Sequence, residues 1–153
     1  MTAAILYNSD DIDVTHHPHL IETTLELQHY KGKILILDDD AMMRQAFSNV
    51  LTCLEYMSIC TCEGAETLRI YQQARDGENP FTGVILDLHN HLGKGGIETF
   101  VDLKQLDPNI NAEICSGDTV APEMHHYQRY GFRGALAKPF GLKDLALVLK
   151  CLC

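Results

Sequence analysis

Short apolar runs alternate with longer amphipathic segments from residue 33 to residue 152 of the chain. The runs are five to seven residues long and rich in Ile, Leu, Val and small residues, which is typical of strands buried in a sheet. Five strands are therefore predicted, at KILIL (33–37), MSICTC (57–62), TGVILDL (82–88), NAEICS (111–116) and GALAK (134–138).

The segments that follow these runs repeat their apolar residues at the three- and four-residue spacing of an α-helix. In the second of them the predicted inward face holds Ala65, Leu68 and Tyr71, and Gly77 is expected to end the helix. Five helices are predicted, over residues 41–54, 64–77, 97–107, 121–131 and 141–152.

Regular alternation of strands and helices indicates a parallel β-sheet with helices on both faces. Crossovers between parallel strands are right-handed, so the predicted fold is a doubly wound α/β sandwich of five strands and five helices. Such sheets bind their ligands at the carboxyl ends of the strands, where the strand order reverses. The residues at those ends are therefore the first candidates for function.

Polar residues gather at the carboxyl ends of four predicted strands: Asp38 and Asp39, then Asp87, Ser116 and Lys138. Carboxylates that meet there repel, because two charges ~4 Å apart cost on the order of 4 kcal/mol at an effective dielectric of about 20. One aspartate at a strand end often only caps the next helix, but five such residues on one edge favour a site. Carboxylate oxygens suit Mg²⁺ or Mn²⁺, and a lysine adds a fixed positive charge. The set fits phosphoryl transfer to a carboxylate.

The composition is that of a globular protein and narrows the range of partners. The chain has 153 residues, enough for one domain, and a net charge of −9 without a basic run, which argues against nucleic acid or an anionic membrane. No apolar stretch approaches the ~20 residues of a membrane span, and residues 1–13 do not resemble a signal peptide, so a cytoplasmic protein is predicted. The six cysteines form no C-x-x-C pair and are expected to be buried, reduced thiols.

Five motifs occur in a fixed order: ILILDDD (34–40), GVILDL (83–88), GKGGIE (93–98), ICSGD (114–118) and LAKPF (136–140). Each alone is weak, but together they resemble the response-regulator receiver domains of two-component signalling, most closely the receivers of hybrid sensor kinases. The resemblance implies a flavodoxin-like fold with strand order 2-1-3-4-5. It also implies a receiver domain over residues 33–153 and an N-terminal extension over residues 1–32.

The resemblance assigns roles to the acidic residues. Asp87 matches the phosphoacceptor. Asp39 matches the direct ligand of Mg²⁺, Asp38 the acid that binds the metal through water, and His89 the residue that supplies a backbone carbonyl. Asp40 falls outside this set and is expected to cap the first helix.

Other matching positions carry the remaining chemistry. Ser116 matches the hydroxyl residue that follows the phosphoryl group on activation. Lys138 matches the family's lysine, and Pro139 the proline usually reached through a cis bond. Asp118, Ala135 and Pro139 are expected to modulate the site, and the side chain of His89 to modulate the lifetime of the acyl phosphate. A charged His89 ring would exclude the attacking water and lengthen that lifetime, whereas a neutral ring acting as a base would shorten it.

The chain departs from the family pattern at three positions. Receivers usually carry Met-Pro where this chain has Asn90 and His91, and an aromatic switch residue where it has Ala135. Phosphoryl uptake needs neither feature, but a hydroxyl shift that swings an aromatic ring inward requires the ring. How phosphorylation would reach the face of the fourth helix, fifth strand and fifth helix is therefore open.

The implied protein is a single-domain response regulator that receives a phosphoryl group on Asp87 from a histidine kinase or a histidine phosphotransfer protein. It would act as a phosphorelay intermediate or a protein-binding switch and catalyse only its own phosphorylation and dephosphorylation. A homodimer could form through the face just described or through residues 1–32. Within that extension, residues 20–30 fit a helix and a strand equally well.

Two alternatives stay open. The first is a receiver-like interaction module that binds its partner without phosphorylation. The intact acidic residues, hydroxyl and lysine argue against it, but the departures at Asn90, His91 and Ala135 keep it open. The second is a phosphatase of the haloacid-dehalogenase type, since ILILDDDA loosely resembles its D-x-D strand end. That family needs a further acidic pair after the lysine, and here only Asp144 follows.

Overall fold

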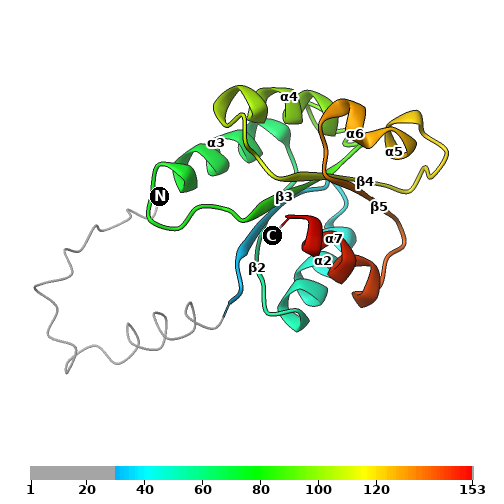
Figure 1. The fold of residues 1–153 in the computed structure, drawn as a ribbon, viewed down its shortest axis with the longest axis horizontal. Helices are drawn as coiled ribbons and strands as arrows, with labels where there is room; N and C mark the ends of the chain where they lie inside the picture. The colour runs from blue at the N-terminus through cyan, green and yellow to red at the C-terminus, as the bar shows by residue number, and fades with distance from the viewer. Residues whose placement is uncertain (1–29, 153) are drawn as a thin grey trace, which may run out of the picture. The chain divides into compact units, whose positions relative to one another are not determined.

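The structure is a computed structural model that describes residues 30–152. Its strands form one five-stranded sheet in the order β2-β1-β3-β4-β5, and all four neighbouring pairs are parallel, as predicted (Figure 1). The strands are β1 (Lys33–Leu37), β2 (Met57–Thr61), β3 (Gly83–Asp87), β4 (Ala112–Ser116) and β5 (Gly134–Ala137).

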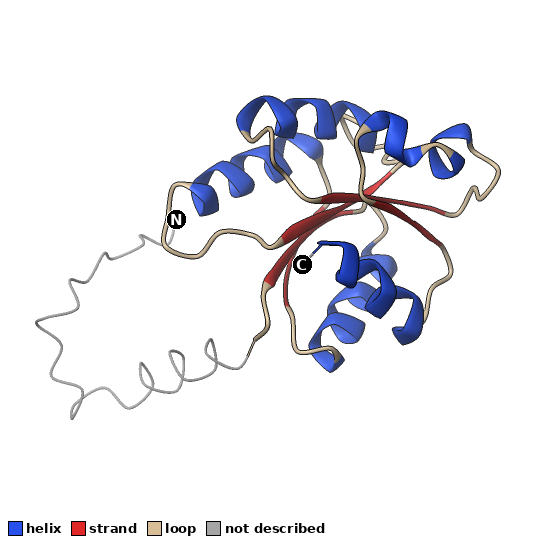
Figure 2. Cartoon of the chain, in the orientation of Figure 1, coloured by secondary structure: helices blue, strands red, loops and turns tan. Residues whose placement is uncertain are grey.

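Helices cover both faces of the sheet (Figure 2). One face carries α2 and α7, and the other carries α3, α4, α5 and α6 (Figure 1). Their bounds are α2 (Ala41–Cys53), α3 (Gly64–Arg75), α4 (Gly96–Leu106), α5 (Pro122–His125), α6 (Tyr127–Tyr130) and α7 (Leu142–Leu152).

The helix predicted over residues 121–131 is two short helices instead of one. His126 has φ −118° and ψ 28°, outside the helical region, so α5 ends at His125 and α6 begins at Tyr127. Gly131 then ends α6 in the left-handed conformation, with φ 95°. The described residues therefore hold six helices where five were predicted.

The two faces of the sheet bury separate apolar clusters. Alternate residues of β1 point to opposite faces, so Ile34 and Ile36 join the cluster under α2 and α7. Leu35 and Leu37 join the cluster under α3 and α4. Both β1 and β3 are buried almost throughout, which is typical of central strands in a parallel sheet. A rigid core thus supports the carboxyl edge of the sheet.

Two predictions about buried side chains need correction. In α3, Ala65 is exposed, whereas Gly64 and Thr67 are buried with Tyr71. The helix is rotated because Gly64 lies against α4, where a Cβ would come 2.3 Å from Thr99 Oγ1. Of the free cysteines in the described residues, Cys53 and Cys151 are exposed, not buried.

The predictions for residues 1–29 lie outside the described residues. Within residues 30–152, none of the helices has the length and apolar character that crossing a membrane requires.

Candidate functional site

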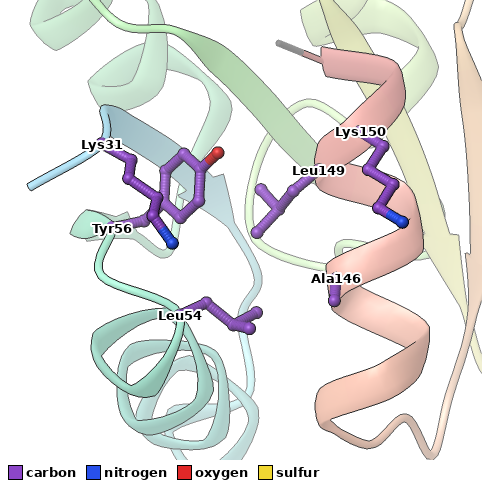
Figure 3. Close-up of a pocket in the computed structure, with 6 residues that line it drawn as sticks. All are labelled: Lys31, Leu54, Tyr56, Ala146, Leu149 and Lys150. Carbon is purple, nitrogen blue, oxygen red and sulfur yellow. The ribbon is translucent and has the colours of Figure 1, made fainter.

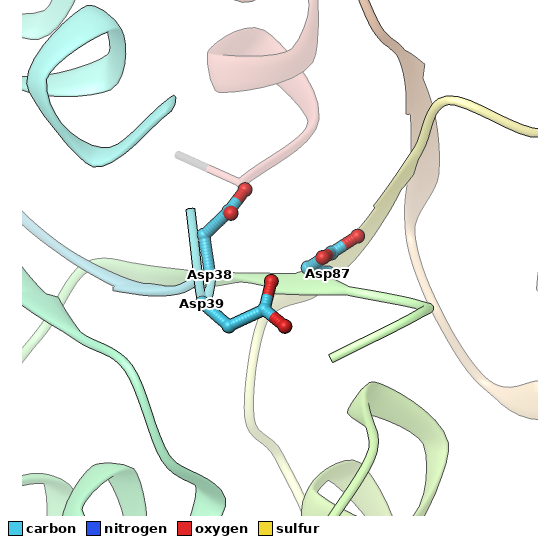
Figure 4. Close-up of side chains that lie close together, drawn as sticks. All are labelled: Asp38, Asp39 and Asp87. Atoms are coloured by element: carbon cyan, nitrogen blue, oxygen red, sulfur yellow. The ribbon is translucent and has the colours of Figure 1, made fainter. Parts of the chain in front are cut away.

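The acidic cluster forms because β1 and β3 are neighbours that end at the same edge. Leu37 pairs with Leu86 in the parallel register, so the residues that follow them, Asp38 and Asp87, lie side by side. Each of Asp38, Asp39 and Asp87 offers a carboxylate oxygen, and these oxygens lie within 4.8 Å of one another. Figure 4 shows the three side chains converging from the two strand ends. The sequence prediction that these three carboxylates meet agrees with this geometry.

Lys138 brings a positive charge between two of these carboxylates. Its Nζ lies 2.7 Å from Asp38 Oδ2 and 3.1 Å from Asp87 Oδ1. Burial lowers the pKa of Lys138, but the hydrogen bond with Asp38 and the charge of Asp87 outweigh this and raise it above its usual value. Burial raises the pKa of the Asp38 carboxyl, and the contact with Lys138 opposes that rise. The ammonium group therefore stays charged and offsets part of the acidic repulsion.

The loop that carries the first aspartates is held by its own side chains and by α2. Arg44 Nη1 donates hydrogen bonds to the backbone carbonyls of Asp38, at 2.8 Å, and Asp39, at 3.0 Å. Asp40 caps α2 as predicted, since its Oδ1 accepts from the backbone N–H of Met42 at 2.8 Å. Arg44 was not singled out from the sequence, although its place one turn into the helix after the aspartates could have suggested such a contact.

Ser116 is fully buried at the end of β4, and its hydroxyl has two partners. The backbone N–H of Asp118 donates to Ser116 Oγ at 3.0 Å, and His89 Nδ1 lies 3.1 Å from the same oxygen. The His89 ring therefore reaches from the loop after β3 to the hydroxyl at the end of β4. The side chain of Asp118 turns back to its own loop, where Oδ1 accepts from Val120 N at 3.1 Å.

The loop between β3 and α4 contacts the acidic cluster through its backbone. The N–H of His91 donates to Asp39 Oδ2 at 2.9 Å. Asn90 is buried beside it and donates from Nδ2 to the carbonyl of Cys62 at 3.1 Å. A Cβ on Gly96, the first residue of α4, would come 2.3 Å from the carbonyl oxygen of Asp87, so glycine is needed for this close approach. No sequence signal pointed to the role of Asn90.

The remaining predicted residues lie around the cluster instead of within it. The Lys138–Pro139 peptide bond is cis. Phe140, next along the chain, packs on Phe47 of α2 with 4.4 Å between ring centroids. Ala135 is partly buried and packs against the apolar cluster under α3 and α4, on the face away from α2 and α7.

A groove elsewhere on the domain is separate from this site. It has a volume of about 410 Å³ and lies at the opposite edge of the sheet, where α2 ends and β2 begins (Figure 3). Its lining residues are Lys31, Leu54, Tyr56, Ala146, Leu149 and Lys150. The groove contains none of the predicted site residues.

The acidic cluster fits a hard divalent cation. Its donors are oxygen atoms, the ligands that Mg²⁺ and Mn²⁺ prefer. Asp38 Oδ2 is buried, accepts no well-aligned hydrogen bond and depends on the charge of Lys138. The three carboxylates carry three negative charges, and Lys138 offsets one of them. A divalent cation beside Asp39 and Asp87 would offset the other two.

Comparison with known proteins identifies a family and several similar folds. The family model described as "Response regulator receiver domain" matches residues 34–150. Among solved structures, a response regulator receiver domain protein from Clostridium thermocellum has 21% sequence identity and a TM-score of 0.71, over 79% of this chain and 93% of that one. The chemotaxis response regulator CheY4 of Vibrio cholerae has 24% identity and a TM-score of 0.66, over 80% and 98%.

A third similar structure is the receiver domain of a sensor histidine kinase from Pseudomonas aeruginosa, described with a magnesium ion coordinated in its active-site cleft. It has 14% identity and a TM-score of 0.68, over 79% of this chain and 97% of that one. These likenesses establish the fold. No curated protein gives a significant match.

The matched family is one of signalling modules, and no enzyme family is indicated, so the haloacid-dehalogenase alternative has no support. The family match spans all five strands except Lys33, the first residue of β1, and includes every residue of the acidic cluster. The chain therefore belongs to the response regulator receiver domain family.

Proposed function

We propose that this receiver accepts a phosphoryl group on Asp87 in a reaction that depends on Mg²⁺ or Mn²⁺. One observation carries the proposal: three carboxylates offer oxygens within 4.8 Å of one another while Lys138 contacts both Asp38 and Asp87. Asp38, Asp39, Asp87 and the backbone carbonyl of His89 would hold the metal. The bound ion would supply positive charge that screens the carboxylates from the incoming phosphoryl oxygens.

Asp87 is suited to be the nucleophile because Lys138 engages only one of its oxygens. Nζ lies 3.1 Å from Oδ1, which leaves Oδ2 free of that contact. A carboxylate oxygen attacks the phosphorus, the bond from phosphorus to the donor breaks, and the electron pair leaves with the donor's nitrogen or oxygen. Lys138 then stabilises the negative charge gathered on the acyl phosphate.

Ser116 and His89 would act after the transfer. The Ser116 hydroxyl, whose oxygen lies 3.1 Å from His89 Nδ1, has one proton that it could donate to a phosphoryl oxygen on Asp87. The His89 ring, held beside Ser116 Oγ and two residues beyond Asp87, would restrict the approach of water to the phosphorus. We infer that His89 prolongs the phosphorylated state.

The edge around the cluster supports a protein as the phosphodonor. Met42 at the start of α2 is 81% exposed and Val120 in the loop after β4 is 79% exposed. Leu92 after β3 and Leu142 at the start of α7 are also exposed. Large apolar side chains at this edge suit a histidine kinase or a histidine phosphotransfer protein that presents phosphohistidine, with the receiver acting as a relay intermediate or a switch.

The main test is labelling of the purified protein by acetyl phosphate with and without Mg²⁺. Asp87→Asn should abolish uptake, since the amide is a poor nucleophile, and chelation of the metal should abolish it in the wild type. Asp76→Asn, at an exposed position after α3, is the matched control and should label normally. Undiminished labelling of the Asp87 variant would refute the assignment. A wild type that never labels would favour an interaction module that works without phosphate.

The lifetime of the label tests the role of His89. His89→Ala should speed the loss of phosphate several-fold, because the ring no longer limits access of water. His91→Ala is the matched control, since its exposed side chain lies two residues away. A longer lifetime in the His89 variant would show that the ring acts as a base and would contradict the inference.

A further inference from the structure

Asn90 joins two loops at the carboxyl edge of the sheet. It lies between β3 and α4 and is only 7% exposed. Its Nδ2 donates to the carbonyl of Cys62, just after β2, at 3.1 Å. Its Oδ1 accepts from the backbone N–H of Leu92 at 2.8 Å. The buried amide of Asn90 therefore makes two hydrogen bonds. Its NH₂ group bonds to the loop after β2, and its oxygen bonds within the loop after β3.

The residues on either side of Asn90 are the ones that contact the site. Before it, the His89 ring lies 3.1 Å from the Ser116 hydroxyl. After it, the His91 N–H donates to Asp39 Oδ2 at 2.9 Å. The nitrogen of His91 is bonded directly to the carbonyl carbon of Asn90, so the position of Asn90 determines where that N–H points.

We propose that Asn90 is a positioning residue for the cation site: its two side-chain hydrogen bonds hold the loop so that the His91 N–H orients the Asp39 carboxylate. This inference rests on the proposed function, since it concerns the metal on which phosphoryl uptake depends. One oxygen of Asp39 is thus bound by the loop, and Asp39 offers a carboxylate oxygen within 4.8 Å of those of Asp38 and Asp87. An apolar residue at position 90 would remove the hydrogen-bond partner of the Cys62 carbonyl and that of the Leu92 N–H, both in partly buried hydrogen bonds.

Asn90→Leu is the sharpest variant, because leucine keeps the branching at Cγ and the number of side-chain heavy atoms and loses both hydrogen bonds. Titration calorimetry with MgCl₂ should show affinity weaker by roughly tenfold, the size of effect typical when support for a metal ligand is removed. Amide hydrogen exchange at His91 should be faster than in the wild type, even without metal. Asn109→Leu, in the exposed turn after α4, is the matched control and should change neither quantity.

Asn90→Ser provides a second variant should the leucine variant fail to fold, since its hydroxyl can still accept from Leu92 N–H. Its Mg²⁺ affinity should fall between those of the wild type and Asn90→Leu. If the wild type binds Mg²⁺ and the folded variants bind it equally well, the positioning role is refuted and the proposed function stands. Unchanged His91 exchange would refute it as well. A wild type without Mg²⁺ binding would overturn both.

Discussion

Two carboxyl groups in residues 30–152 have no exposed surface, Asp38 and Glu113, and their surroundings differ completely. Asp38 lies 2.7 Å from the ammonium of Lys138. Glu113, in the middle of β4, has no hydrogen-bond partner for either oxygen. Its carboxyl group occupies the space left by Gly134 on β5, where a Cβ would come 2.8 Å from both oxygens.

Burial raises the pKa of both carboxyls, but only Glu113 lacks a neighbour that opposes the rise, and its pKa reaches about 8. Glu113 is therefore protonated and neutral near pH 7, while Lys138 favours the charged form of Asp38. Burial alone thus makes an inert core acid, whereas burial beside a lysine and further carboxylates makes a site for a cation. The experiments below change one side of this contrast at a time.

The largest effect is expected from replacing Glu113, and it should depend on pH. Because burial raises the pKa of this carboxyl from 4.5 to about 8, the unfolded chain loses the proton first as the pH rises. The wild type should therefore lose stability between about pH 4.5 and pH 8, by up to roughly 5 kcal/mol. Glu113→Leu removes the group and should flatten this dependence, as measured by urea unfolding from pH 5 to pH 9.

Glu66→Leu is a suitable control, since Glu66 lies in the first turn of α3 and is only partly buried. A Glu113 variant that loses stability with pH as steeply as the wild type would show that Glu113 is not the protonated group. Glu113→Gln, which keeps the shape without the ionisation, should follow the leucine variant in its pH dependence.

A smaller loss of stability is expected on the charged side of the comparison. Lys138→Met keeps the length of the side chain and leaves Asp38 and Asp87 without their ammonium group. Breaking this buried contact should lower the free energy of unfolding by about 3 kcal/mol when metal is chelated. Mg²⁺ should restore part of the loss, since a cation again lies among the carboxylates.

Lys143→Met removes a lysine at an exposed position of α7 and serves as the control for the loss of one charge. Equal unfolding free energies for the two variants would mean that Lys138 does not offset the repulsion. The difference between Asp38 and Glu113 would then need a cause other than the charge of Lys138.

Much of the fold and of the acidic cluster could be predicted from the sequence. The strands and most helices follow from hydrophobic spacing, and the acidic cluster follows from polar residues at the ends of strands in a parallel sheet. The burial of Glu113 could also have been predicted, because a strand covered on both faces buries its side chains whichever way they point.

Other features depend on contacts that periodicity does not encode. The break at His126 is a matter of backbone angles within a segment of helical composition. The burial of Gly64 and Thr67 in place of Ala65 depends on the close approach of α4. The bonds of Asn90 and the contact between His89 and Ser116 join loops whose geometry is fixed only after the sheet has formed.

The smallest changes in stability are expected from replacing Asp39 or Asp40, and these two neighbours should differ in their effect on Mg²⁺ binding. Asp40 lies outside the cluster and caps α2, so Asp40→Ala should cost about 1 kcal/mol of stability and leave Mg²⁺ affinity unchanged. Asp39→Ala should weaken Mg²⁺ binding and cost little stability without metal, because it also removes repulsion.

Thermal unfolding with and without MgCl₂ measures both effects together. At ten times its dissociation constant, Mg²⁺ should stabilise the wild type and Asp40→Ala equally, by about 1.4 kcal/mol. The same concentration should stabilise Asp39→Ala far less, since one of the three carboxylates is missing. If Asp40→Ala instead loses the response to Mg²⁺, the cap residue takes part in metal binding. The boundary between the cation site and the helix terminus would then lie one residue further along the chain.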